Sequence, residues 1–218
     1  MTDPDERARQ PAAESTDATA WFERLYAEAQ AGAAVVPWDV ADPHYLLTGW
    51  VGGRTLDGSG RRALVVGAGL GRDAEFIAGF GYDTTAFDIS PSAIESARQR
   101  HADSAVHYVV ADLFDPPARW RHAFDLVVES LTVQALPVAE RGPAIAQVPR
   151  FVAPGGTLLV IAAGRETPPG DGPPWPLDRG EVEAFAADGV EAVHIAEIRD
   201  PADRTSLRWQ VEFRRPAT

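Results

Sequence analysis

Three closely spaced glycines and one later aspartate are the residues whose spacing most clearly predicts chemistry. Gly67, Gly69 and Gly71 follow an apolar run at 63–66, and Asp88 ends a second apolar run seventeen residues after Gly71. Glycines let the backbone approach a ligand closely, and a carboxylate at the end of the next strand can accept hydrogen bonds from both hydroxyls of a ribose. The pattern predicts a site for a cofactor that contains a nucleoside.

The spacing of the glycines indicates which kind of nucleoside cofactor. A dinucleotide site has the pattern G-x-G-x-x-G, whereas this chain has G-x-G-x-G, which suits a ligand without a pyrophosphate. The backbone amides at the start of the following helix favour a carboxylate on the ligand. Arg72 either pairs with that carboxylate or is a solvated side chain at a helix start.

Two more acidic residues end strand-like runs. Asp112 can accept a hydrogen bond from the amino group of adenine while Leu113 or Phe114 packs on the base, or it can be an ordinary turn aspartate. Glu129 ends the run that starts at Phe124, and it is expected to face the centre of the cleft, where it can hold an ammonium group or touch the substrate.

Composition narrows the class of protein. The 218 residues carry a net charge of -12, which disfavours a nucleic-acid partner. The absence of cysteine and lysine excludes thiolate chemistry, a P-loop lysine and a Schiff-base lysine, and no metal is expected. Without an apolar run of membrane-spanning length or a signal peptide, a cytoplasmic protein without a membrane partner is expected. Nothing in the sequence indicates an oligomeric state.

Short β-rich runs alternate with helical segments after Arg62, as in parallel βαβ units. We expect an α/β fold with a Rossmann-like, doubly wound sheet of seven strands and helices on both faces. Residues 1–16 are expected to be a disordered leader, and 17–218 a single domain whose residues 17–55 form a helical cover. The expected strands are 63–67, 83–88, 106–111, 124–129, 156–162, 192–198 and 206–213, with the last two antiparallel.

Helix signals fit between these strands. Trp21, Leu25 and Ala29 share one stripe that stops before Gly32, and Ser90 is a natural N-cap with Pro91 at the first helical position. Two further helices are expected at 140–151, ended by the turn Pro154-Gly155-Gly156, and at 178–187. The segment 165–176 is too rich in proline and glycine to be a helix or a central strand.

Five segments together resemble class I S-adenosylmethionine-dependent methyltransferases. They are 65–73, 87–94, 111–114, 124–128 and 152–158, in the order and spacing of that family. The resemblance implies a mostly parallel sheet with an antiparallel last strand, S-adenosyl-L-methionine as cofactor, Asp88 on its ribose and Asp112 near its adenine. The residues expected around this cofactor are Trp38, Gly67, Ala68, Gly69, Gly71, Arg72, Asp88, Ile89, Asp112, Leu113 and Glu129.

The N-terminal part resembles a narrower group. Pro37-Trp38-Asp39 with Pro43-His44 is similar to the thiopurine methyltransferase-like branch and its tellurite-resistance relatives. That resemblance implies that Trp38 and Asp39 belong to a segment folded over the cofactor, although a single tryptophan beside a helix can equally be a core residue.

Methyl transfer is an in-line displacement that depends chiefly on positioning in a dry pocket. A small molecule is the expected acceptor, with sulfur, nitrogen, oxygen and a metalloid all open as nucleophiles. The expected cover holds Trp38 and Trp175 above Glu129 and Ser130, and His44 or Tyr45 is either a general base or structural. The alternatives are an NAD-linked oxidoreductase, disfavoured by the glycine spacing, and a non-catalytic module that binds the cofactor.

Overall fold

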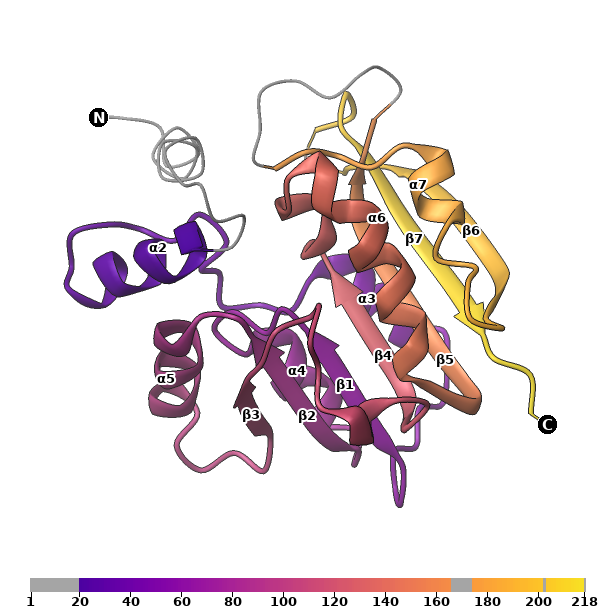
Figure 1. Ribbon diagram of the computed structural model, residues 1–218, viewed down its shortest axis with the longest axis horizontal. Coiled ribbons are helices and arrows are strands. Elements are labelled where there is room, and N and C mark those ends of the chain that lie inside the picture. The colour runs from indigo at the N-terminus through magenta and orange to yellow at the C-terminus, as the bar shows by residue number, and fades with distance from the viewer. Residues whose placement is uncertain (1–19, 166–173, 202, 218) are drawn as a thin grey trace.

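The computed structural model describes residues 20–165, 174–201 and 203–217 (Figure 1). The expected leader at 1–16 lies outside these residues. Seven strands form one sheet in the order β3-β2-β1-β4-β5-β7-β6. The strands are β1 (Arg62–Val66), β2 (Asp83–Asp88), β3 (His107–Val110), β4 (Phe124–Ser130), β5 (Val152–Gly164), β6 (Glu191–Arg199) and β7 (Leu207–Arg214). Each overlaps one of the seven predicted strands.

The pairing confirms the predicted fold class. Strands β1 to β5 pair in parallel, and β7 is antiparallel to both β5 and β6. The winding order reverses between β1 and β4, which are neighbours in the sheet. In an open parallel sheet, ligands bind outside the carboxyl ends of the strands at such a reversal.

Helices cover both faces of the sheet because its central strands are apolar on both sides. On one face, α3 (Tyr45–Gly52), α4 (Arg72–Ala78) and α5 (Pro91–Arg100) bury Leu47, Ile77 and Ile94 in one apolar cluster with side chains of the sheet. On the other face lie α6 (Val138–Gln147) and α7 (Arg179–Glu183), with short 3₁₀ turns at Ala118–Trp120, Val133–Ala135 and Val148–Phe151.

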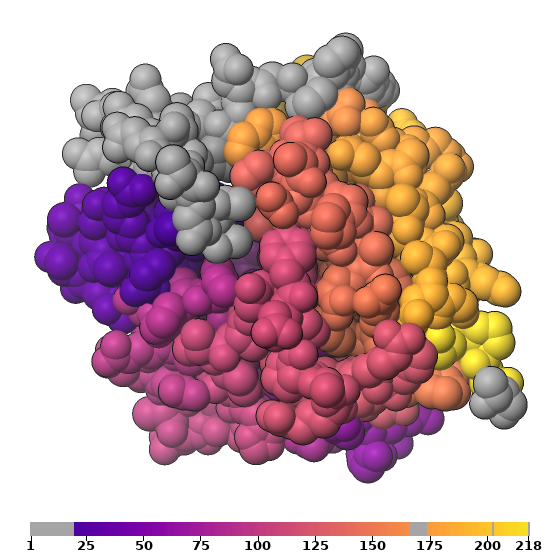
Figure 2. Space-filling view, in the orientation of Figure 1, coloured from indigo at the N-terminus to yellow at the C-terminus, as the bar shows by residue number. Residues whose placement is uncertain are grey.

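The N-terminal helix α2 (Ala20–Gln30) lies beside α5 at one end of the sheet, and the hairpin β6-β7 forms the other end (Figure 1). The space-filling view shows the indigo residues of this segment packed against the magenta α5 region (Figure 2). The predicted stripe is confirmed, since Trp21 and Leu25 are buried and Gly32 has a φ of +73°.

Only part of the predicted cover at 17–55 lies over the ligand edge. Helix α3 packs on a face of the sheet instead, because Leu46 and Leu47 are buried there and Gln210 Nε2 donates to the carbonyl of Leu46. The cover therefore consists of α2 and the segment that follows it.

Local signals explain how several elements begin and end. The predicted cap is confirmed, since Ser90 Oγ accepts from the amide of Ala93 at the start of α5. Asp178 and Glu181 form a capping box, but α7 ends at Glu183 rather than near 187. The helix predicted at 140–151 starts at Val138 and changes to a 3₁₀ turn at Val148, beside Pro149, whose ring cannot supply a helical N–H.

The predicted turn at Pro154-Gly155-Gly156 lies inside β5, which already begins at Val152. The register with β4 shifts between the pairs made by Phe124 and Leu126, and Gly155 has a φ of +75°. The glycines therefore form an irregularity in the strand rather than its start. Within the described ranges, no helix is long and apolar enough to cross a membrane.

Candidate cofactor and substrate site

A cavity of about 460 Å³ lies at the carboxyl ends of β1, β2 and β4, where the winding order reverses. The start of β7 and the cover segment complete its walls. The lining residues used below are Phe22, Tyr26, Trp38, Val40, Gly67, Ala68, Gly69, Arg72, Asp73, Asp88, Ile89, Asp112, Leu113, Ser130, Leu131, Gln134, Leu136, Pro174 and Arg208.

The glycine loop lies along this cavity. Gly67 and Gly69 adopt φ angles of +65° and +50°, a conformation that side chains other than glycine rarely take. A Cβ atom on Gly67 would lie 2.2 Å from Thr132 Oγ1, and one on Gly69 would lie 2.9 Å from the hydroxyl of Tyr26. Both glycines are therefore required by the close approach of neighbouring side chains, and they leave backbone facing the cavity.

Gly71 has a different role from the one predicted. It is not among the lining residues, and it is the N-cap of α4 with a φ of +93°. A Cβ atom there would lie 2.3 Å from the hydroxyl of Tyr108. Gly71 thus allows α4 to start close to β3 and does not line the cavity.

Asp88 lines the cavity and is almost fully buried. Its Oδ2 accepts from the amide of Gly69 at 2.9 Å, and its Oδ1 accepts from the amide of Ser90 at 3.0 Å. Burial raises the pKa of this carboxyl, while the backbone hydrogen bonds from Ser90 and Gly69 oppose that shift. Asp88 therefore ties the glycine loop to the start of α5 beside Ile89, which also lines the cavity.

Arg72 and Ala68, both predicted to bind the cofactor, line the cavity wall. The Nε of Arg72 is 3.6 Å from Asp73 Oδ1, and that oxygen also accepts from the amide of His44. The guanidinium is therefore a cation held beside the glycine loop, where a ligand carboxylate would sit.

Asp112 and Leu113 also line the cavity. Asp112 Oδ1 accepts from the amide of Phe114 at 2.8 Å, as a turn aspartate does. Its Oδ2 makes no hydrogen bond to a described residue and stays available to a ligand. The two alternatives for Asp112 are thus compatible.

The cover contributes an aromatic wall. Trp38 lines the cavity and donates from Nε1 to the hydroxyl of Tyr26 at 2.7 Å, with the two rings edge to face at 6.1 Å. Asp39, also expected in the cover, instead pairs with Arg100 on α5 at 2.7 Å. Trp175 is not among the lining residues, and its neighbour Pro174 lies in the wall in its place.

Glu129 does not face the cavity. Its Oε1 accepts from the amides of Thr132 and Val133, while Oε2 is buried without a hydrogen bond among the described residues. Burial raises the pKa of this carboxyl to about 7. The side chain stabilises the turn after β4, and its neighbour Ser130 faces the cavity instead.

The two candidate bases, His44 and Tyr45, also lie outside the cavity wall. His44 is the N-cap of α3, its Nδ1 accepts from the amide of Leu46, and burial lowers its pKa to about 4. Tyr45 donates to Asp200 Oδ2 at 3.3 Å. Both side chains thus have structural roles, because each forms its hydrogen bonds to residues outside the cavity wall.

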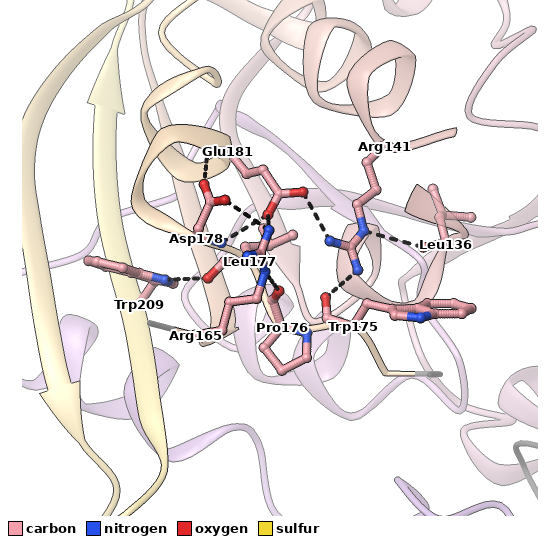
Figure 3. Close-up of polar contacts among 9 residues, drawn as sticks. All are labelled: Leu136, Arg141, Arg165, Trp175, Pro176, Leu177, Asp178, Glu181 and Trp209. Carbon is pink, nitrogen blue, oxygen red and sulfur yellow. Dashed lines mark hydrogen bonds and ion pairs between the residues drawn. The ribbon is translucent and has the colours of Figure 1, made fainter. Parts of the chain in front are cut away.

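The segment next to Pro174 is held by a polar network (Figure 3). The buried Arg141 donates to the carbonyls of Trp175 and Leu136 and pairs with Glu181 at 3.0 Å. Arg165 donates to the carbonyl of Pro176 and pairs with Asp178 and Glu181. Consequently Arg165 and the residues around 175–178 lie side by side, and this part of the cavity wall is fixed.

Sequence reasoning missed several lining residues. Tyr26 lay on a predicted amphipathic helix, so the pattern of that helix could have indicated it. No sequence pattern indicated that Gln134 and Arg208 would line the cavity. The position of Gln134 depends on the path of the loop after β4, and that of Arg208 depends on β7 entering the sheet beside β5. Within the described ranges, no group of three His, Asp or Glu side chains could hold a metal.

Comparisons with known proteins agree with this geometry. Residues 64–160 match the family model described as "Methyltransferase domain". A malonyl-[acyl-carrier protein] O-methyltransferase from Serratia marcescens is 34% identical over 130 residues, which are 58% of this chain and 48% of that protein. This chain thus spans about half the length of the curated relative that it matches.

Two solved structures share the fold. The N-methyltransferase NodS from Bradyrhizobium japonicum, with S-adenosylhomocysteine, has a TM-score of 0.67 at 19% identity and covers 89% of this chain and 99% of that one. A 1,6-didemethyltoxoflavin-N1-methyltransferase from Burkholderia thailandensis, also with S-adenosylhomocysteine, has a TM-score of 0.66 at 16% identity and covers 99% and 92%. Residues 64–160 thus resemble a methyltransferase domain, and the chain shares the fold of these two methyltransferase structures.

Proposed function

We propose that the protein transfers the methyl group of S-adenosylmethionine to a small-molecule nucleophile. The observation that carries this proposal is that one cavity contains both halves such a reaction needs. The glycine loop, Asp88 and Asp112 form the nucleoside half, and Val40, Leu131 and Pro174 offer an apolar half for the acceptor. In-line displacement requires both reactants in one closed space, because the methyl carbon must lie between donor and nucleophile.

The residues around the acceptor half support catalysis by positioning. Among the described residues that line the cavity there is no histidine, Asp73 and Asp88 accept from backbone amides, and Asp112 belongs to the nucleoside half. Tyr26 lines it too, but burial raises the pKa of its hydroxyl far above neutral. We therefore infer an acceptor whose lone pair is available at neutral pH without an enzymatic base.

The relatives leave the nucleophilic atom open. Two are named for N-methylation and one for O-methylation, and the two names that specify an acceptor, malonyl-[acyl-carrier protein] and 1,6-didemethyltoxoflavin, specify one other than a nucleic acid. With a net charge of -12, a nucleic-acid acceptor would be repelled by the average field. Membership of the thiopurine methyltransferase-like branch stays a proposal, supported by Trp38 in the cavity wall, and so does a cytoplasmic location.

The decisive experiment is a screen of small thiols, amines, phenols and oxyanions with S-adenosylmethionine, measured as S-adenosylhomocysteine formed. Turnover of at least one class is expected. Titration calorimetry with S-adenosylhomocysteine and with NADH runs beside it. Binding of NADH alone would replace the proposal with a dehydrogenase, and binding of S-adenosylhomocysteine without turnover of any acceptor would favour a non-catalytic module.

A further inference from the structure

Gln134 presents a hydrogen-bond donor to the cavity that no part of the described chain uses. The residue lies in the 3₁₀ turn after β4, it is 6% exposed, and it lines the cavity. Its Oε1 accepts from the amide of Ala163 at 2.5 Å. A backbone N–H can only donate, so the atom facing Ala163 must be the oxygen, and Nε2 is left on the other side.

Nε2 makes no hydrogen bond to a described residue. A buried or half-buried donor without a partner costs stability, so such groups in proteins are normally satisfied by water or a ligand. Gln134 Nε2 is therefore available to a ligand in the cavity that Gln134 lines.

The lining residues adjacent to Gln134 in its network are apolar. Leu136, two residues after Gln134, and Pro174, next to its hydrogen-bond partner Trp175, line the cavity and carry no polar side-chain atom. Arg208, which also lines the cavity, pairs with Asp200 at 3.2 Å. A ligand group beside Gln134, Leu136 and Pro174 therefore meets a hydrogen-bond donor next to apolar side chains, which favours a neutral molecule over an anion.

The donor is held rigidly. The carbonyl of Gln134 accepts from the amide of Trp175 at 2.8 Å. Arg141 donates to the carbonyls of both Trp175 and Leu136 (Figure 3). Backbone and side chain of Gln134 are thus fixed by separate partners. Rotation of the amide toward another direction would break the hydrogen bond to Ala163.

We propose that Gln134 determines acceptor specificity, by donating a hydrogen bond from Nε2 to a carbonyl oxygen or ring nitrogen of a neutral, largely apolar methyl acceptor. Arg141 is a positioning residue for this contact. The proposal rests on the proposed methyl transfer, because it assigns the acceptor half of the same cavity.

The test uses a matched pair of probes, acetophenone and ethylbenzene. Acetophenone has a ketone group where ethylbenzene has a methylene group. Affinities of both are measured by NMR for the whole protein, with and without S-adenosylhomocysteine, for the natural chain and for Gln134→Met. The preference for acetophenone relative to ethylbenzene should fall roughly three- to tenfold in the variant, as expected for one neutral hydrogen bond. Gln99→Met, an exposed glutamine on α5, is the control and should leave the preference unchanged.

A second measurement does not depend on the variant folding. In the natural chain, acetophenone should shift the NMR signals of the Gln134 side-chain amide, which are assigned through the covalent bonds of that side chain. Ethylbenzene should not shift them. Absence of acetophenone binding, equal preferences in the natural chain and Gln134→Met, or unshifted amide signals would each overturn the proposal. Failure of S-adenosylhomocysteine to bind would instead overturn the methyltransferase proposal, since the ligand-free arm still reports on Gln134.

Discussion

Glu23 Oε2 on the cover helix accepts a hydrogen bond from Ser90 Oγ at 2.6 Å, two residues beyond Asp88. The same carboxylate accepts from the amide and the hydroxyl of Ser92. These contacts to Ser90 and Ser92 lower the pKa of Glu23 despite its partial burial. The cover is therefore attached to the helix whose start holds the carboxylate expected on the ribose.

Replacing Glu23 by alanine should loosen this attachment and weaken cofactor binding. Hydrogen bonds to a carboxylate that is partly solvated predict a loss of about 1–2 kcal/mol, which is roughly five- to thirtyfold in the affinity for S-adenosylhomocysteine. Titration calorimetry measures it. Glu28→Ala, an exposed glutamate on the same helix, is the matched control, and equal affinities for the two variants would contradict the attachment.

Asp88→Ala should weaken S-adenosylmethionine binding by about 1–3 kcal/mol, because charge-assisted hydrogen bonds to the ligand and the support of Gly69 are both lost. Asp83→Ala, at the exposed start of the same strand, should bind the cofactor as the natural chain does. Calorimetry on both variants decides the matter, and unchanged affinity in Asp88→Ala would remove the residue from the site.

Glu129 predicts a specific pH dependence of stability. Its pKa rises from 4.5 to about 7 on folding, so the folded protein binds more protons between these values. The free energy of unfolding therefore falls as the pH rises from about 4.5 to about 7, and then levels off. Urea denaturation from pH 5 to pH 8 should show the natural chain losing about 2–3 kcal/mol relative to Glu129→Gln. Parallel curves for the two proteins would show that the carboxyl titrates normally.

Gly71→Ala should destabilise the fold rather than remove a ligand contact. The added Cβ would meet the hydroxyl of Tyr108, and a φ of +93° is strained for alanine. A loss of about 2–4 kcal/mol is expected from overpacking and backbone strain together. Thermal unfolding measures it, and adding Tyr108→Phe should restore part of the loss. A variant as stable as the natural chain would contradict the contact.

Arg141→Met should destabilise the protein by about 3–5 kcal/mol, because the carbonyls of Trp175 and Leu136 and the carboxylate of Glu181 would lose a buried donor. Arg179→Met removes an exposed pair with Glu183 and should change stability by no more than about 0.5 kcal/mol. Chemical denaturation of the two variants gives the comparison. Similar losses of stability for both variants would mean that burial does not strengthen the ion pair between Arg141 and Glu181.

The sequence predicted the parts of the fold and site that depend on short stretches of chain. Apolar runs predicted all seven strands, and the glycine spacing with Asp88 located the cavity, since strand, turn and helix start are adjacent in sequence. Ser90 carried its own capping signal. None of these features depends on contacts between residues that are distant in the sequence.

What sequence reasoning missed depends on contacts between distant segments or on side-chain direction. Glu129 and Ser130 are adjacent at the end of β4, and only the path of the following turn decides that the glutamate faces its amides while the serine faces the cavity. Trp175 was expected over the ligand, but Arg141 and Gln134 hold its backbone so that Pro174 lies there. No local pattern encodes either outcome.

The strand order also has a consequence for biosynthesis. During translation β6 leaves the ribosome before β7, yet β7 is its only neighbour in the sheet among the described strands. The nascent polypeptide must therefore carry β6 unpaired until β7 is made, and Arg208 joins the cavity at the same moment. We expect ligand to assist folding only after β7 has been synthesised, so that premature termination anywhere before β7 yields a product that the cofactor cannot rescue.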